Sequence, residues 1–217
     1  MQLYVTKPSP YARKAWAAVL ELGLHDRVEI VELPARMPTV PKPDLEAVNP
    51  LGKVPSLITD DGDLIADSPV IVAYLNHLAG GRLIPRGPER WRALTLEALA
   101  DGCMDAGVVL RVEGLKGEAY RDEGEIAAHV AKIERTLDLI ETEPRWLSGK
   151  MNVGSMALVC AIDWLIFRNL IPYPLVARPN LALAMAQLLE RPAFAATRPW
   201  ATPLERAGSL PFQAPTL

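Results

Sequence analysis

The chain has 217 residues, of which 50% are hydrophobic and 23% are charged, and its formal net charge at pH 7 is −3. This length and composition predict a folded protein with one large or two small hydrophobic cores, and they exclude a disordered chain. A small negative charge without a long basic run gives no electrostatic reason to bind nucleic acid, so we expect no nucleic acid partner.

Several features indicate a cytoplasmic protein. Residues 1–5 lack the charged segment and long apolar core of a secretion signal. The most apolar later stretch, residues 156–167, is shorter than the roughly 20 residues that span a bilayer, so we expect no membrane partner. Cys103 and Cys160 are too few and too far apart for a disulfide framework.

The three histidines are scattered, so we expect no metal site.

The first third of the chain alternates β-prone runs with helical patterns. The first strand-helix-strand unit should form a right-handed parallel crossover. Asp60-Asp61-Gly62-Asp63 should then turn an antiparallel hairpin. Residues 34–43, which hold four prolines, should be irregular because proline disfavours the interior of regular structure. We therefore expect strands at residues 3–5, 28–33, 55–59 and 64–66, and helices at residues 11–22 and 68–78.

The remainder of the chain shows helical patterns only. The glycines and prolines of residues 80–88 form a natural boundary. We therefore expect a mixed α/β domain at residues 1–80, a linker at 81–88 and an all-α domain at 89–217. The helices of the second domain are expected at about residues 89–111, 123–142, 156–167 and 181–189.

Three motifs lie at the ends of these elements. Ser9-Pro10-Tyr11 opens the first helix, residues 49–55 (Asn-Pro-Leu-Gly-Lys-Val-Pro) precede the hairpin, and Asp67-Ser68 opens the next helix. Together with residues 97–102, these motifs resemble the cytosolic glutathione transferase superfamily over essentially the whole chain. The run Ser9-Pro10-Tyr11-Ala12-Arg13-Lys14 is closest to uncharacterised bacterial members with a Ser-Pro-(Tyr/Phe)-x-Arg-Lys motif.

This resemblance implies an architecture and a function. The architecture is an α/β thioredoxin-like N-terminal domain (βαβαββα) followed by an all-α C-terminal domain, in a homodimer. The function is a glutathione transferase for detoxification, with glutathione as co-substrate and a small apolar electrophile, or with glutathione-dependent peroxidase or reductase activity. The alternative is a non-catalytic member that binds glutathione or a protein. Serine at position 9, where redox relatives have cysteine, argues against dithiol exchange by the protein itself.

The resemblance assigns the backbone of glutathione to Val54 and Pro55. An unpaired backbone edge can hold an extended peptide through main-chain hydrogen bonds. In the family, the residue before a cis proline supplies this edge, and Val54 has that position here. The alternative is a trans proline that merely starts a strand, since cis X-Pro bonds are only about 5–6% of those in folded proteins.

The charged ends of glutathione are assigned to Lys53, Asp67 and Ser68. A helix N-terminus has unpaired N–H groups and a positive dipole, so it binds carboxylates. Ser68 would bind the γ-glutamyl carboxylate, Asp67 the amine beside it, and Lys53 the glycyl carboxylate. The alternatives are a Ser68 that only caps its helix and a Lys53 that is only solvated. We call Lys53, Val54, Pro55, Asp67 and Ser68 the glutathione cradle.

Ser9 is the candidate catalytic residue. A free thiol of this type has a pKa near 8.5, and lowering it by about two units would make the thiolate dominant at pH 7. A hydrogen bond to a charged group stabilises it by roughly 1.5–3 kcal/mol, and a helix N-terminus adds up to about 2 kcal/mol. Ser9 could donate that hydrogen bond, or it could simply cap the helix. Both roles predict the same residue.

An electrophile pocket should lie between the domains, beside the first helix. Its candidate residues are Tyr11, Met104, Val108, Arg111 and Trp164, although periodic apolar residues on helices also form cores. Asp101 is a candidate for contact with the glutathione amine of the neighbouring subunit, with a solvated or salt-bridged role as the alternative.

The resemblance also points to a helix start near Asn152. Members of the superfamily often place a capping residue there, with an aspartate three residues later. Here Asn152 supplies the cap, but Ser155 replaces the carboxylate. A capping box needs a side chain that reaches back to the N–H of the cap, so we expect this helix start to be weaker.

Overall fold

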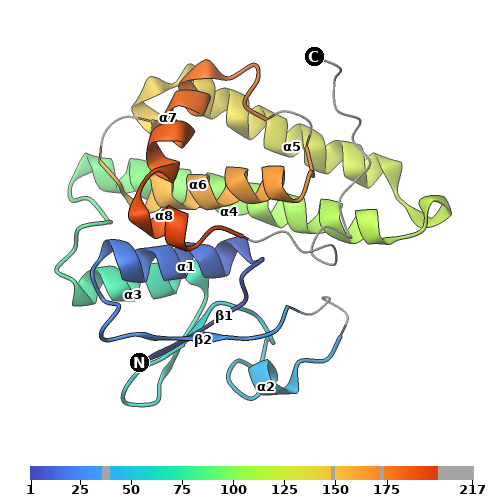
Figure 1. The fold of residues 1–217 in the computed structure, drawn as a ribbon. Coiled ribbons are helices and arrows are strands. Elements are labelled where there is room, and N and C mark those ends of the chain that lie inside the picture. The colour runs from blue at the N-terminus through green and yellow to red at the C-terminus, as the bar shows by residue number, and fades with distance from the viewer. Residues whose placement is uncertain (36–39, 148–149, 172–173, 200–217) are drawn as a thin grey trace.

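The computed structural model describes residues 1–35, 40–147, 150–171 and 174–199. Part of the proline-rich stretch and the end of the expected helical domain lie outside these residues. The chain forms a small sheet, two helices over it and a layer of further helices, as Figure 1 shows. Within the described residues, no helix combines the length and the apolar character that a membrane span requires.

The sheet has four strands in the order β2-β1-β3-β4. Strand β1 (Gln2–Val5) pairs in parallel with β2 (Glu29–Glu32) and antiparallel with β3 (Ser56–Ile58), which pairs antiparallel with β4 (Leu64–Ile65). The predicted parallel crossover and hairpin are therefore confirmed. The hairpin turn needs Gly62, whose φ of 88° is readily available only to glycine.

Helices α1 (Pro10–Glu21) and α3 (Ser68–Leu78) lie between the sheet and the C-terminal helices (Figure 1). The alanines of α1 are buried at positions 12, 15, 17 and 18, and such small side chains let a helix be covered on several sides. Helix α1 accordingly contacts β1 and α3 as well as α6 and α8. A short helix, α2 (Pro43–Glu46), begins at the last proline of the stretch expected to be irregular, and it corresponds to the second helix of the implied βαβαββα order. Proline at the first helical position explains it, because its fixed φ suits that position.

The C-terminal layer contains helices of very different lengths. Their bounds are α4 (Pro88–Leu115), α5 (Glu123–Thr142), α6 (Val153–Phe167), α7 (Pro179–Leu189) and α8 (Pro192–Ala196), with 3-10 turns at Glu118–Tyr120 and Pro144–Trp146. Helix α6 is buried on nearly all sides and packs mainly against α4. Two glycines allow this contact, since a Cβ at Gly107 or Gly154 would meet the facing helix at 2.6 or 2.5 Å.

The start of α6 corrects one expectation. The side chain of Asn152 accepts hydrogen bonds from the N–H groups of Gly154 (2.9 Å) and Ser155 (3.1 Å). The hydroxyl of Ser155 accepts in turn from the N–H of Asn152 at 3.0 Å. The expected loss of the reciprocal bond is therefore wrong, because a serine hydroxyl reaches the cap N–H in place of a carboxylate.

Candidate functional site

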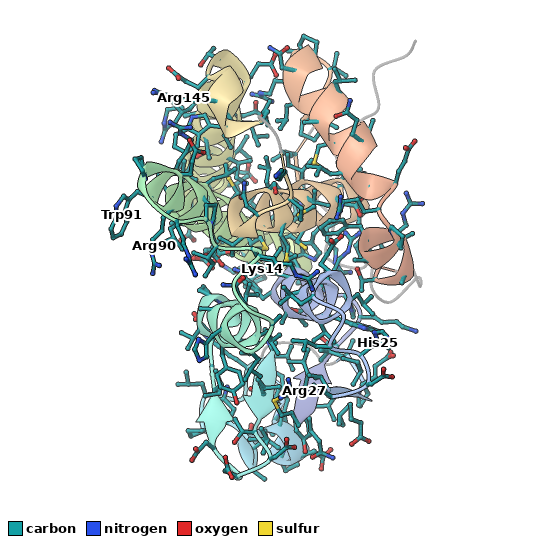
Figure 2. The ribbon with its side chains drawn as sticks, turned by 90° about the vertical axis from the view of Figure 1, so that its left-hand side faces the viewer. Lys14, His25, Arg27, Arg90, Trp91 and Arg145 are labelled. Atoms are coloured by element: carbon teal, nitrogen blue, oxygen red, sulfur yellow. The ribbon has the colours of Figure 1, made fainter. Side chains whose placement is uncertain are left out.

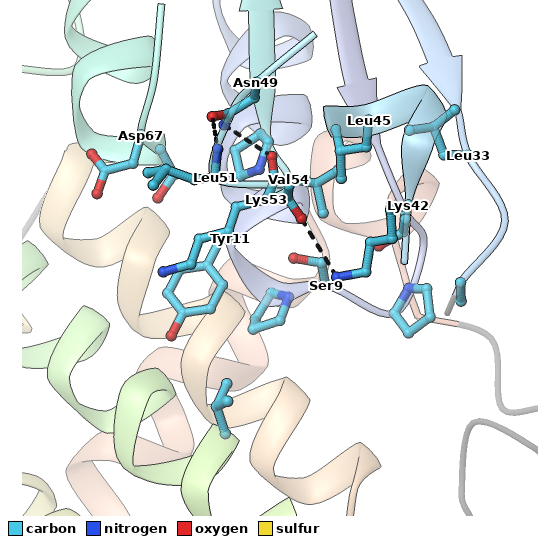
Figure 3. A pocket seen from close by; sticks show the side chains of 18 of the residues that line it. Ser9, Tyr11, Leu33, Lys42, Leu45, Asn49, Leu51, Lys53, Val54 and Asp67 are labelled. Atoms are coloured by element: carbon cyan, nitrogen blue, oxygen red, sulfur yellow. Dashed lines mark hydrogen bonds between the residues drawn. The ribbon is translucent and has the colours of Figure 1, made fainter. Parts of the chain in front are cut away.

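A cavity of about 700 Å³ lies between the loops of the N-terminal part and helices α4 and α6. Figure 3 shows side chains that line it. The N-terminal segments that contribute are the start of α1, the end of the chain segment after β2, the region of α2, the loop before β3 and the start of α3. All five cradle residues and Ser9 line this cavity, and so do four of the expected electrophile-pocket residues: Tyr11, Val108, Arg111 and Trp164.

The loop before β3 presents an open backbone edge at Val54. The Val54–Pro55 peptide bond is cis, as the resemblance implies. Within the described residues, neither the N–H nor the C=O of Val54 takes part in a backbone hydrogen bond, because the pairing of β3 with β1 ends at Ser56. These groups can therefore pair with a ligand that has a peptide backbone.

The side chain of Asn49 holds this loop in place. It is 3% exposed, and its amide group donates to the carbonyl of Lys53 at 3.2 Å and to the hydroxyl of Ser56 at 2.9 Å. Its carbonyl oxygen accepts from the N–H of Leu51 at 3.0 Å (Figure 3). Lys42 adds a hydrogen bond to the carbonyl of Gly52 at 3.4 Å. The edge at Val54 is thus supported by buried polar contacts.

The start of α3 forms the second part of the site. Asp67 is the N-cap residue and is exposed, whereas Ser68 is the first helical residue and is 1% exposed. Ser68 is therefore not the cap of the helix, so the alternative in which it only caps the helix is wrong. No side-chain cap hydrogen bond is present at this helix start. The first helical N–H with a carbonyl partner is that of Ile71, which donates to Asp67 at 2.9 Å. The N–H groups of Ser68 and Val70 thus remain for a carboxylate.

Ser9 is the N-cap residue of α1. Its hydroxyl oxygen accepts a hydrogen bond from the N–H of Ala12 at 3.2 Å, so the capping role considered from the sequence is present. The hydroxyl proton is separate from that bond and has no acceptor among the described residues. A hydroxyl has one proton and two lone pairs, so Ser9 can cap α1 and still donate to a sulfur in the cavity.

Tyr11 is a second hydroxyl in the cavity, but its proton is already engaged. Its O–H donates to the carboxylate of Asp105 on α4 at 2.5 Å. Burial and, after it, this hydrogen bond to Asp105 raise the pKa of Tyr11 above its ordinary value. The phenol therefore stays protonated at neutral pH and is directed at Asp105.

Asp101 lies in a largely buried ion cluster with Lys14 and Glu97. The ammonium of Lys14, which is 0% exposed, donates to both oxygens of Asp101 at 2.8 and 2.7 Å and to Glu97 at 3.0 Å. Figure 2 shows Lys14 on α1 near the C-terminal layer. Burial raises the pKa of Asp101 and of Glu97, and Lys14 opposes that rise. The salt bridge considered as the alternative for Asp101 is therefore present, and its contact with glutathione of a neighbouring subunit stays a prediction.

Met104 does not line the cavity. It is 0% exposed and belongs to the hydrophobic core, while Asp105 and Val108 on the same helix line the site. Four further charged residues, which were not predicted from the sequence as part of the pocket, also line it: Lys42, Asp44, Asp105 and Arg168. Arg168 follows Trp164 by four residues, and this helical spacing could have indicated it. The proline-rich stretch around Lys42 and Asp44 has no such periodicity.

Other reactive side chains lie away from the cavity. Cys103 and Cys160 are buried free thiols, and burial raises the pKa of each to about 11, so both stay protonated at neutral pH. In the described part of the chain, no group of three or more His, Cys, Asp or Glu side chains could hold a metal ion.

Comparisons with known proteins agree on one family. The model of the glutathione S-transferase N-terminal domain matches residues 8–78. The uncharacterised GST-like protein YibF of Escherichia coli K12 is 35% identical over 204 residues, which cover 92% of this chain and 98% of that protein.

Solved structures give the same result. A glutathione transferase family member from Pseudomonas fluorescens Pf-5 with bound glutathione is 36% identical, with a TM-score of 0.87 and coverage of 92% of this chain and 99% of that one. A family member from the same organism with bound S-(propanoic acid)-glutathione is 36% identical, with a TM-score of 0.82 and coverage of 93% of this chain and 100% of that one. A glutathione S-transferase from Methylobacillus flagellatus with bound glutathione is 30% identical, with a TM-score of 0.77 and coverage of 92% of this chain and 99% of that one. The chain therefore belongs to the glutathione S-transferase family.

Proposed function

We propose that this protein binds glutathione in the cavity and activates its thiol for attack on a small electrophile. One observation carries the proposal. A single cavity gathers the open backbone edge at Val54, the N-terminus of α3 and the hydroxyl of Ser9 at the N-terminus of α1. These three features match the peptide backbone, the γ-glutamyl carboxylate and the thiol of glutathione.

The binding step follows from the charges and open backbone groups of the cradle. The N–H and C=O of Val54 pair with the backbone of the tripeptide. The N–H groups of Ser68 and Val70 bind the γ-glutamyl carboxylate, and Asp67 binds the amine beside it. Lys53, exposed at the cavity, pairs with the glycyl carboxylate. The Pseudomonas and Methylobacillus proteins with bound glutathione support glutathione as the ligand.

The chemical step needs a thiolate. The N-terminus of α1 and a hydrogen bond from Ser9 both favour the negative sulfur, so the thiol proton passes to water more readily. The sulfur then uses its electron pair to form a bond to the electrophilic carbon. The displaced pair leaves with the leaving group, or moves to the adjacent atom, which takes a proton from water. Tyr11 is not the donor, because its proton is held by Asp105.

The family supports some further parts of this proposal. A Pseudomonas relative binds S-(propanoic acid)-glutathione, so in that protein the site holds a glutathione whose sulfur carries another group. We further infer from family membership a homodimer in the cytoplasm that acts in detoxification.

Calorimetric titration with glutathione and a panel of conjugation and peroxidase assays test this proposal. We expect wild-type protein to bind glutathione, and Asp67→Ala to bind it more weakly than Asp61→Ala, a matched change at an exposed aspartate in the hairpin turn. We expect Ser9→Ala to bind glutathione but to turn over at least about tenfold more slowly, since a hydrogen bond to a charged group is lost. Ser9→Thr, which keeps a hydroxyl, should retain more activity.

Each alternative gives a different result. No binding of glutathione would rule out both the cradle and the enzyme. Binding without turnover in the whole panel would favour the non-catalytic alternative. Turnover that is the same in Ser9→Ala and wild type would leave the cradle in place and remove the role of Ser9.

A further inference from the structure

The wall of the cavity formed by the helical layer is not purely apolar. Val108 and Arg111 lie three residues apart on α4, and Trp164 and Arg168 lie four residues apart at the end of α6, so each pair shares a helix face. All four line the cavity. An apolar and a cationic side chain thus lie together on each of the two helices.

The charge on this wall is positive. Among the described residues of α4 and α6, including the C-cap residue Arg168, the charged side chains that line the cavity are Asp105, Arg111 and Arg168. The carboxylate of Asp105 accepts a hydrogen bond from the hydroxyl of Tyr11. Arginine stays charged in proteins, so the two guanidinium groups give this wall a net positive charge.

Burial strengthens the effect of that charge. Arg168 is 3% exposed, and its guanidinium carbon lies 4.7 Å from the centre of the Phe167 ring. Arg111 is half-buried, so its long side chain borders the cavity with reduced access to water. Attraction between opposite charges increases as water is excluded, and a planar guanidinium can bind a carboxylate through two parallel hydrogen bonds.

Glutathione itself has its partners on other walls. Under the proposed function, its two carboxylates meet the start of α3 and Lys53, and its thiol lies at the start of α1. Arg111 and Arg168 come from the helical layer, on the side of the cavity where the electrophile that the sulfur attacks must be placed. Their positive charge therefore lies nearer to the second substrate than to the proposed partners of the glutathione carboxylates.

We propose that the second substrate carries a carboxylate beside an apolar or aromatic part, and that Arg111 binds this carboxylate. Val108 and Trp164 contact the apolar or aromatic part of this substrate. The buried guanidinium of Arg168 adds to the positive potential in the cavity. This inference rests on the proposed function, because it assumes glutathione in the cradle. It replaces the apolar electrophile expected from the sequence with an organic acid.

Binding of matched conjugates tests the inference without requiring turnover. Two pairs of ligands differ only in an acid or an amide: S-(4-carboxybenzyl)glutathione against S-(4-carbamoylbenzyl)glutathione, and S-(2-carboxyethyl)glutathione against S-(2-carbamoylethyl)glutathione. Their Kd values are measured by calorimetry at neutral pH. We expect the acid of at least one pair to bind about tenfold more tightly than its amide, as a charge-assisted pair at a partly buried site should.

Variants of Arg111 identify the group responsible. Arg111→Gln should remove the preference for the acid, and Arg111→Lys should keep part of it because the charge remains. Arg135→Gln is the matched control, since Arg135 is exposed on α5 and does not line the cavity, and it should keep the whole preference. Thermal unfolding of each variant confirms that it is folded at the temperature of the titration.

Free glutathione, titrated in the same buffer, separates the two proposals. If glutathione does not bind, the proposed function fails and this inference fails with it. If glutathione binds but neither acid binds more tightly than its amide, the inference is overturned and the cradle stands. A preference that persists unchanged in Arg111→Gln also overturns it.

Discussion

The hydroxyl of Tyr11 on α1 donates a hydrogen bond to the carboxylate of Asp105 on α4 at 2.5 Å. One helical turn further along α1, Lys14 binds Asp101 and Glu97, which also lie on α4. Helix α1 is therefore fixed to the C-terminal layer by polar contacts in its first turn and a half. Because the cavity opens at the start of α1, these contacts also fix one side of the site.

Replacing Tyr11 with phenylalanine tests whether this bond is structural or catalytic. We expect Tyr11→Phe to lower the free energy of unfolding by about 1 kcal/mol, the usual net value of one hydrogen bond, because Asp105 is exposed and water can replace the phenol. Urea denaturation measures this change. The rate of conjugation should fall less than in Ser9→Ala, since the phenol proton is directed at Asp105. An equal or larger loss of kcat would show that Tyr11 acts on the thiol.

Lys14→Met should destabilise the protein strongly. Lys14 is 0% exposed, and its removal leaves the carboxylates of Asp101 and Glu97 buried without their cation. Breaking a buried ion pair in this way costs about 3–5 kcal/mol. Lys132→Met, at an exposed lysine on α5, is the matched control and should change stability little. Urea denaturation at pH 7 compares the two variants.

The loss in Lys14→Met should depend on pH. Burial already raises the pKa of Asp101 and Glu97 in the folded protein, and Lys14 opposes this rise, so its removal raises both pKa values further. A carboxyl whose pKa is raised by folding destabilises the fold above that pKa, and the penalty disappears as the pH falls toward the pKa of the unfolded chain. The difference from wild type should therefore shrink between pH 7 and about pH 5. A constant difference would contradict this explanation.

Gly107→Ala should disturb the electrophile side of the cavity. A Cβ at Gly107 would lie 2.6 Å from the ring of Trp164 and 2.8 Å from Leu165, both of which are tightly packed. We expect a loss of about 1–3 kcal/mol in unfolding free energy, as overpacking usually causes. Because Trp164 lines the cavity and must move, the KM for the electrophile should change more than the Kd of glutathione.

Gly102→Ala on the same helix is the control for that experiment. A Cβ at Gly102 would meet no atom within 4 Å, and alanine is the better helix former by up to about 1 kcal/mol. Gly102→Ala should therefore leave stability unchanged or raise it. Similar losses in the two variants would show that the contact with Trp164 is not the cause.

Local sequence signals account for much of the fold. Helices α3 (Ser68–Leu78) and α5 (Glu123–Thr142) have the predicted bounds. Proline in the first turn of α3 and the apolar periodicity of both helices are encoded within a few residues. The short helix α8 was not predicted, and the one-turn helix α2 was implied only by the family's βαβαββα order, because four or five residues carry too little periodicity. Their existence depends on packing against the rest of the chain.

The sequence by itself pointed to two motifs on the N-terminal side of the cavity, through their resemblance to the glutathione transferases. Val54-Pro55 and Asp67-Ser68 are short motifs at the ends of regular elements, so a family pattern of a few residues was enough to place both at the cavity. Tertiary structure alone decided the opposite wall, where Val108 lines the cavity, Met104 lies in the core and Asp101 binds Lys14. The physical reason is that these residues share one long helix, and the side chains that face the cavity depend on how α1 and α6 pack against it.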